Sequence, residues 1–206
     1  MTAPTLSEDT VIVSYLTLRK VVGALGMALP VVLAVWGFAL QHRVELLPSI
    51  SEYYDLRTRD AFVGILFTIA WFLFTYHGYE RQDDIAGNFA CAFALGVALF
   101  PVSGSPVEHV VHFISAAALF LVLAYFALFL FTKSAGFETH AKRLRNRVYR
   151  ACGAVMLLCI ALIAAYQLAP QAMPASARNP VFWLETIALW AFGFSWFVKG
   201  EAILKD

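Results

Sequence analysis

Six apolar stretches run through this chain, and each is close to the length that crosses a lipid bilayer as a helix. They cover about 21–41, 60–79, 85–102, 107–132, 148–168 and 180–198, where roughly 20 apolar residues are needed. None alternates apolar and polar residues, as the strands of a membrane barrel do. We therefore predict an all-α polytopic membrane protein, in which residues 1–206 form a single domain of six transmembrane helices in one bundle.

The composition supports this class and excludes others. Hydrophobic residues make up 61% of the chain and charged residues 14%, and the mean hydropathy is +0.71. The net charge of +1 provides no basis for binding nucleic acid. The cysteines Cys91, Cys152 and Cys159 all lie in apolar stretches, so we interpret them as small hydrophobic residues. No feature of the sequence indicates an oligomeric state.

The distribution of Lys and Arg predicts the orientation in the membrane. With six spans, eleven of the 15 Lys and Arg residues fall on the side of the two termini; the four on the other side are Arg43, Arg57, Arg59 and Arg178. Positive residues are enriched in cytoplasmic loops. We expect a multi-pass protein of a bacterial inner membrane, with both termini in the cytoplasm. The connection 42–59, the SGSP turn at 103–106 and the segment 169–179 then face outward.

Glu185 is the most unusual residue in the apolar stretches. It lies five residues after Pro180, inside the last stretch, and an ionisable group inside hydrocarbon costs roughly 3 kcal/mol or more. At 1.5 Å per residue, Glu185 and His112 each lie about 7 Å below the outer ends of their helices. His109 and His112 share one helix face because they are three residues apart. We predict that His112 and Glu185 form a charge-assisted hydrogen bond. Arg57, Arg59 and the loop Pro48-Ser49-Ile50-Ser51 are the alternative partners of Glu185.

Polar residues of the first outer connection reach the same level. Ser49 and Ser51 lie in this connection, and the charged residues around them are Glu52, Arg57, Arg59 and Asp60. Together with His109, these four charged residues are our candidates for ligand binding. We predict an outer-leaflet polar pocket that binds a lipid headgroup, for lipid remodelling, presentation or sensing, with a membrane lipid as the partner.

Two other functions stay open at this stage. A membrane-embedded acyltransferase or lipid hydrolase would use Ser49 or Ser51 as nucleophile, His112 as base and Glu185 or Asp60 to orient the base. Zinc held by His109, His112 and a carboxylate would be a second catalytic route, but there is no H-E-x-x-H motif, and we expect no metal and no cofactor. A small-solute transporter ranks third, because the middles of the spans have no polar path.

A second polar cluster lies at the opposite side, around Asp83, Asp84, Asn88 and Lys199. We interpret these residues as charges at helix ends, with Lys199 extending toward water.

Three segments resemble the DRAM family of membrane proteins, which includes autophagy modulators and GPI-anchor-remodelling PGAP-type proteins. They are Pro48-Ser49-Ile50-Ser51, the pair ALGVALFP (94–101) and VHFISAAALF (111–120), and LETIALWAFGFSWFVKG (184–200). The resemblance implies six spans, cytoplasmic termini and a polar face outside the cytoplasm. It points to Pro48, Ser49, Ser51, His112 and Glu185 but implies no shared reaction, because members have varied roles.

The chain differs from the family pattern in having Leu184 and Thr186 around Glu185 and a compact basic loop at 133–147. Its small size suggests a bacterial member, for which GPI-anchored substrates are not expected.

Overall fold

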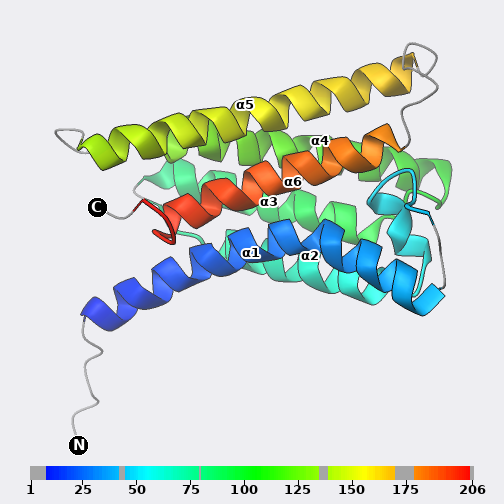
Figure 1. Ribbon diagram of the computed structural model, residues 1–206, viewed down its shortest axis with the longest axis horizontal. Helices are drawn as coiled ribbons and strands as arrows, with labels where there is room; N and C mark the ends of the chain where they lie inside the picture. The colour runs from blue at the N-terminus through cyan, green and yellow to red at the C-terminus, as the bar shows by residue number, and fades with distance from the viewer. Residues whose placement is uncertain (1–7, 42–44, 79, 135–138, 170–178, 205–206) are drawn as a thin grey trace, which may run out of the picture.

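The computed structural model describes residues 8–41, 45–78, 80–134, 139–169 and 179–204, and this part of the chain is helical with no strand. A 3-10 helix, η1 (Ser51–Asp55), follows α1, and a π-helical segment, η2 (Phe126–Leu130), extends α4. The long helices, labelled in Figure 1, are α1 (Glu8–Gln41), α2 (Arg59–Phe74), α3 (Arg81–Leu99), α4 (Pro106–Tyr125), α5 (His140–Leu168) and α6 (Pro180–Lys199).

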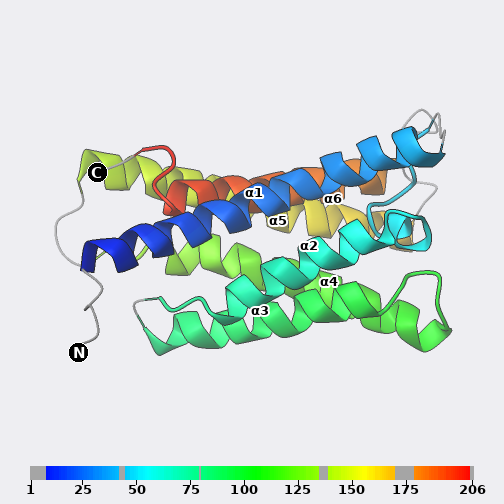
Figure 2. The same ribbon diagram turned by 90° about the horizontal axis from the view of Figure 1, so that it is seen from below.

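The helices form a closed ring. Each helix packs against its neighbours in the chain, and α6 returns to pack against α1. Figures 1 and 2 show the six helices running side by side along one axis. The loop end of the bundle carries residues 45–58 and 100–105, and the terminal end carries residues 75–78 and 200–204. The start of α1 and the end of α6 are at the same end of the bundle (Figure 1), and Gly200 lies against Leu16 and Lys20 of α1.

Small residues set the close packing between helices. A Cβ added to Gly23 would lie 2.6 Å from the carbonyl oxygen of Gly193, and one added to Gly193 would lie 2.5 Å from that of Gly23. The backbones of α1 and α6 therefore touch, as helices in membranes commonly do at small residues. In α3, the alanine stripe Ala90, Ala94 and Ala98 is fully buried.

Four helical segments are long and apolar enough to cross a membrane. They are Tyr15–Ala39, Pro106–Leu130, His140–Leu168 and Pro180–Lys199. The α2 helix has 16 residues, about 24 Å at 1.5 Å per residue, which is shorter than a hydrocarbon core of about 30 Å. The α3 helix begins with the charged residues Arg81, Asp83 and Asp84. The chain is thus an all-helical bundle with four helices that could cross a membrane.

Two predicted boundaries were wrong. The first span is helical as predicted, and the helix that contains it runs from Glu8 to Gln41. The second helix ends at Phe74 rather than 79, because the buried Tyr76 packs against the rings of Phe126 and Trp196 and draws the chain out of the helix.

The second wrong boundary is that of the basic loop predicted over 133–147, of which residues 140–147 are helical. The Thr139 hydroxyl accepts a hydrogen bond from the backbone N–H of Lys142 at 3.1 Å and so starts α5 early. Arg145, Asn146 and Tyr149 of this first part of α5 are buried.

Candidate functional site

The connection after α1 is fastened to the start of α6 by three hydrogen bonds. The Asn179 side-chain amide donates to the carbonyl of Leu46 at 2.9 Å. The backbone N–H of Phe182, in the first turn of α6, donates to the carbonyl of Pro48 at 2.9 Å. The backbone N–H of Ile50 donates to Oε2 of Glu185 at 2.6 Å. Groups that a helix start leaves unpaired are thus satisfied by the connection.

Glu185 therefore does not bond to His112, and the predicted Glu185–His112 pair was wrong. The two residues lie at one end of the bundle, but the 46–51 segment lies between them and supplies a partner to each: Ile50 to Glu185, and Ser51 to His112. The alternative partner, the loop Pro48-Ser49-Ile50-Ser51, is the one that the structure shows, through the backbone N–H of Ile50.

His112 is held by both ring nitrogens. It is only 2% exposed, and its Nδ1 lies 2.7 Å from the carbonyl oxygen of Phe100. Because a carbonyl only accepts, Nδ1 carries the hydrogen, and in the neutral ring Nε2 is an acceptor. The α3 helix ends at Leu99 and Phe100 is extended, so this carbonyl is free to accept.

Ser51 completes the arrangement. Its Oγ lies 2.9 Å from Nε2 of His112, so the hydroxyl donates to the ring nitrogen. Nδ1 is at the same time fixed by Phe100. A hydroxyl bonded to a base that a third group orients is the geometry of an activated nucleophile. The third group is a backbone carbonyl here; neither Glu185 nor Asp60 takes that place.

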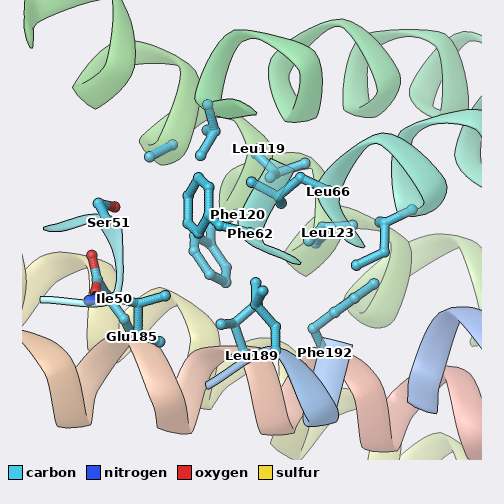
Figure 3. A pocket seen from close by; sticks show the side chains of 14 residues that line it. Ile50, Ser51, Phe62, Leu66, Leu119, Phe120, Leu123, Glu185, Leu189 and Phe192 are labelled. Carbon is cyan, nitrogen blue, oxygen red and sulfur yellow. Dashed lines mark hydrogen bonds between the residues drawn. The ribbon is translucent and has the colours of Figure 1, made fainter. Parts of the chain in front are cut away.

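A narrow pocket with a cavity volume of about 60 Å³ opens beside Ser51. Figure 3 shows the oxygens of Ser51 and Glu185 at one end, and Leu123 and Phe192 farther along. Ser51 and Glu185 are the polar residues among those that line it; the others are Leu29, Ile50, Phe62, Leu66, Ile69, Val97, Ala116, Leu119, Phe120, Leu123, Leu189 and Phe192. The pocket lies inside the ring and is polar at the loop end only.

The other predicted catalytic residue, Ser49, is half-buried and has a capping role. Its Oγ accepts a hydrogen bond from the backbone N–H of Glu52 at 3.3 Å. The half-buried Glu52 lies near enough to Glu185 for the two carboxylates to repel each other.

The remaining predicted binding residues lie outside the pocket. The Arg59 guanidinium donates to the Tyr54 hydroxyl at 2.8 Å and lies over its ring. Arg57 and Asp60 are exposed. His109 is exposed, with Nδ1 donating to the carbonyl of Val102 at 2.8 Å. Of the nine residues predicted, the structure thus brings three together: Ser51, His112 and Glu185.

The described residues contain no group of three or more His, Cys, Asp and Glu side chains placed to hold a metal ion. His109 and His112 have separate partners, the carbonyls of Val102 and Phe100. The zinc alternative therefore has no support in the described geometry.

Sequence reasoning missed the backbone partners and the apolar wall. The Phe100 carbonyl orients His112, and the Ile50 N–H holds Glu185. One signal was present: Pro101 follows Phe100, and a helix usually ends at or before the residue preceding a proline. The sequence has no comparable signal for the Ile50 N–H.

Comparison with family models, with curated proteins and with solved structures finds no match. The resemblance to the DRAM family stays a prediction.

Proposed function

We propose that this chain is an integral membrane protein that binds a membrane lipid in the pocket at its loop end. The supporting observation is the lining of that pocket, which is polar around Ser51 and Glu185 and apolar everywhere else. A lipid has the same division into a polar group and a hydrocarbon chain. In this proposal, the polar group lies at Ser51 and Glu185, and the chain lies among Phe62, Leu119 and their neighbours.

The size of the pocket refines the predicted headgroup site. Since a single water needs about 10–15 Å³ on this measure, about 60 Å³ admits part of a slim hydrocarbon chain rather than a bulky headgroup. The headgroup would then lie at the mouth, where Arg57 and Arg59 are exposed at the same end of the bundle. Their guanidinium groups suit a lipid phosphate.

The membrane placement is part of the proposal. We infer six spans, with α2 and α3 completing the ring beside the four longer segments, and both termini in the cytoplasm. The loop end then lies in the outer leaflet. The excess of Lys and Arg on the side of the termini supports this orientation. Labelling of cysteines introduced in each loop, with a thiol reagent that does not cross the membrane of intact cells, would test it.

A transporter is not favoured by the same features. Toward the terminal end, Trp196 packs against Tyr76, Phe126 and Phe131, with ring centroids 5.1, 5.9 and 5.3 Å apart. Trp196 is 1% exposed. The aromatic cluster fills the interior at the level where a path across the bundle would have to continue.

Lipid analysis of a pocket-filling variant tests the proposal. Ala116 lines the pocket, and Ala116→Phe places a ring in it. Ala118→Phe, on the same helix at a position that does not line the pocket, is the matched control. After purification in mild detergent, mass spectrometry should find a lipid bound to the parent and to Ala118→Phe, and little on Ala116→Phe. Equal lipid on both variants, or none on the parent, would contradict the proposal.

A further inference from the structure

We propose that Ser51 and His112 are a nucleophile and general base that transfer the acyl group of the bound lipid. This inference rests on the proposed lipid site and names the substrate class as an ester of a long-chain fatty acid. The observation behind it is the juxtaposition of a serine hydroxyl, an oriented imidazole and an apolar channel at one point of the loop end.

The hydrogen bonds of His112 have a fixed direction. Phe100 fixes the hydrogen on Nδ1 of His112, which leaves the Nε2 lone pair directed at the Ser51 hydroxyl 2.9 Å away. The imidazole can therefore take the hydroxyl proton without rotating.

The surroundings of Ser51 differ from those of Ser49, which lies two residues earlier in the same connection. The Ser49 Oγ accepts from the Glu52 backbone N–H, and none of the residues that the structure describes provides it with a base as partner. It also does not line the pocket, whereas Ser51 does. The structure thus separates two serines that the sequence left equivalent.

The lining of the pocket determines where the substrate would lie. Ser51 lies at the polar end of the pocket and the apolar lining leads away from it (Figure 3). A chain inserted among Leu119, Phe120 and Leu123 would place its carboxyl end at Ser51. An ester carbonyl at that end is within reach of Oγ, and the alcohol part of the ester would point toward the loop end.

The chemistry balances with water as the second reactant. The Ser51 oxygen attacks the ester carbonyl carbon while its proton passes to Nε2 of His112. The tetrahedral intermediate expels the alcohol, which takes the proton from His112, and the acyl group stays on Ser51. Water, deprotonated by His112, then releases the fatty acid and restores the serine; a lipid alcohol in place of water would give acyl transfer instead of hydrolysis.

The geometry also predicts what the Phe100 carbonyl contributes. It keeps the productive tautomer, which is one task of the carboxylate in a Ser-His-Asp triad. It has no full negative charge to stabilise the imidazolium that forms. We therefore expect a slower nucleophile than in a complete triad, one that still depends on His112 by about 100-fold or more.

Labelling with a fluorophosphonate carrying a long alkyl chain tests the inference on the full-length protein in detergent or nanodiscs. We expect tandem mass spectrometry to find the adduct on Ser51. Ser49→Ala is the matched control and should label like the parent, Ser51→Ala should lose the adduct, and His112→Ala should label about 100-fold more slowly. Hydrolysis of a long-chain fluorogenic ester should follow the same order.

Measuring the lipid that co-purifies with the parent protein shows whether the acyl-transfer inference or the lipid site itself has failed. Parent protein that binds lipid but neither labels at Ser51 nor cleaves the ester overturns the acyl-transfer inference and leaves the lipid site standing. Labelling of Ser51→Ala at the parental rate also overturns it. A parent without lipid contradicts the proposed function itself.

Discussion

The two ends of the bundle contain similar ionisable residues but use them differently. At the loop end, His112 and Glu185 bond to neighbouring loop segments and border a pocket. At the terminal end, the buried Asp83, Arg145 and Lys199 lie among backbone carbonyls and aromatic rings. At the loop end, a pocket lies beside the polar groups. At the terminal end, side chains of the bundle surround the polar groups.

Packing at the terminal end explains how buried charges are accommodated there. The guanidinium groups of Arg19 and Arg145 and the ammonium of Lys142 donate to carbonyls of Lys199, Leu204 and Phe131. The Asp83 carboxylate accepts from the backbone N–H of Glu80 at 3.1 Å. Lys199 is 8% exposed and lies over the Phe131 ring, so the prediction that it extends toward water was wrong.

The comparison shows that an ionisable residue in an apolar helix is weak evidence for function on its own. What distinguishes His112 is the combination of an oriented tautomer, a hydroxyl partner and an adjacent cavity. Lys199 is as buried as a functional residue commonly is, but its surroundings are filled by side chains of the bundle. We expect the terminal end to determine stability and the loop end to determine binding.

The largest effect on stability should come from Asp83. Asp83→Ala leaves the backbone N–H of Glu80 without its acceptor and removes one half of the capping box that starts α3. Asp83 is 1% exposed, so we expect the free energy of unfolding to fall by about 3 kcal/mol. Denaturation in detergent measures this.

Asp84→Ala is the matched control for that change, because Asp84 pairs with the exposed His77 at 3.1 Å. It should be close to the parent in stability. Both variants, once folded, should react with the fluorophosphonate as the parent does. A similar loss of stability in the two variants would contradict the distinction between buried and exposed carboxylates at this end.

An intermediate effect is expected from Glu185 at the loop end. Glu185→Ala leaves the Ile50 N–H without its acceptor, which should cost about 2 kcal/mol and loosen the segment that positions Ser51. Glu185→Gln keeps an oxygen that accepts the same hydrogen bond, so it should retain most of the stability. Denaturation and hydrogen exchange at Ile50 measure the difference.

If Glu185→Gln were as damaging as Glu185→Ala, the negative charge rather than the hydrogen bond would be what the site requires. That result would contradict the role of Glu185 as the acceptor that holds the Ile50 N–H.

The smallest effect should come from the exposed pair of Lys133 and Glu80, 2.9 Å apart. The hydrogen bond to the Glu80 carboxylate raises the pKa of the Lys133 ammonium. A raised pKa means that the pair stabilises the fold below the ordinary lysine pKa of about 10.4 and that this contribution is lost as the pH rises above it. Lys133→Ala should lower the melting temperature slightly at pH 7, with less difference from the parent at high pH. An equal difference at both pH values would show that the side chain acts by packing.

Much of the fold follows from the sequence because apolar stretches of this length have few solutions in a membrane. The helix of 180–198 was predicted to within a residue, and the all-helical class was correct. The start of α5 was missed, since the charged residues there are solvated or buried according to neighbours that lie far away in the chain. The number of membrane spans stays a prediction beyond the four helices long and apolar enough to cross.

For the site, the sequence by itself determined which residue types reach the loop end, because the polarity of each stretch and the 1.5 Å rise per residue fix their depth. It could not determine which of them touch. The tertiary structure decided that Ile50 bonds to Glu185, that Ser51 rather than Ser49 bonds to His112, and that the Phe100 carbonyl orients the ring. The physical reason is that backbone N–H and C=O groups are present at every residue, so their partners follow only from how the segments pack.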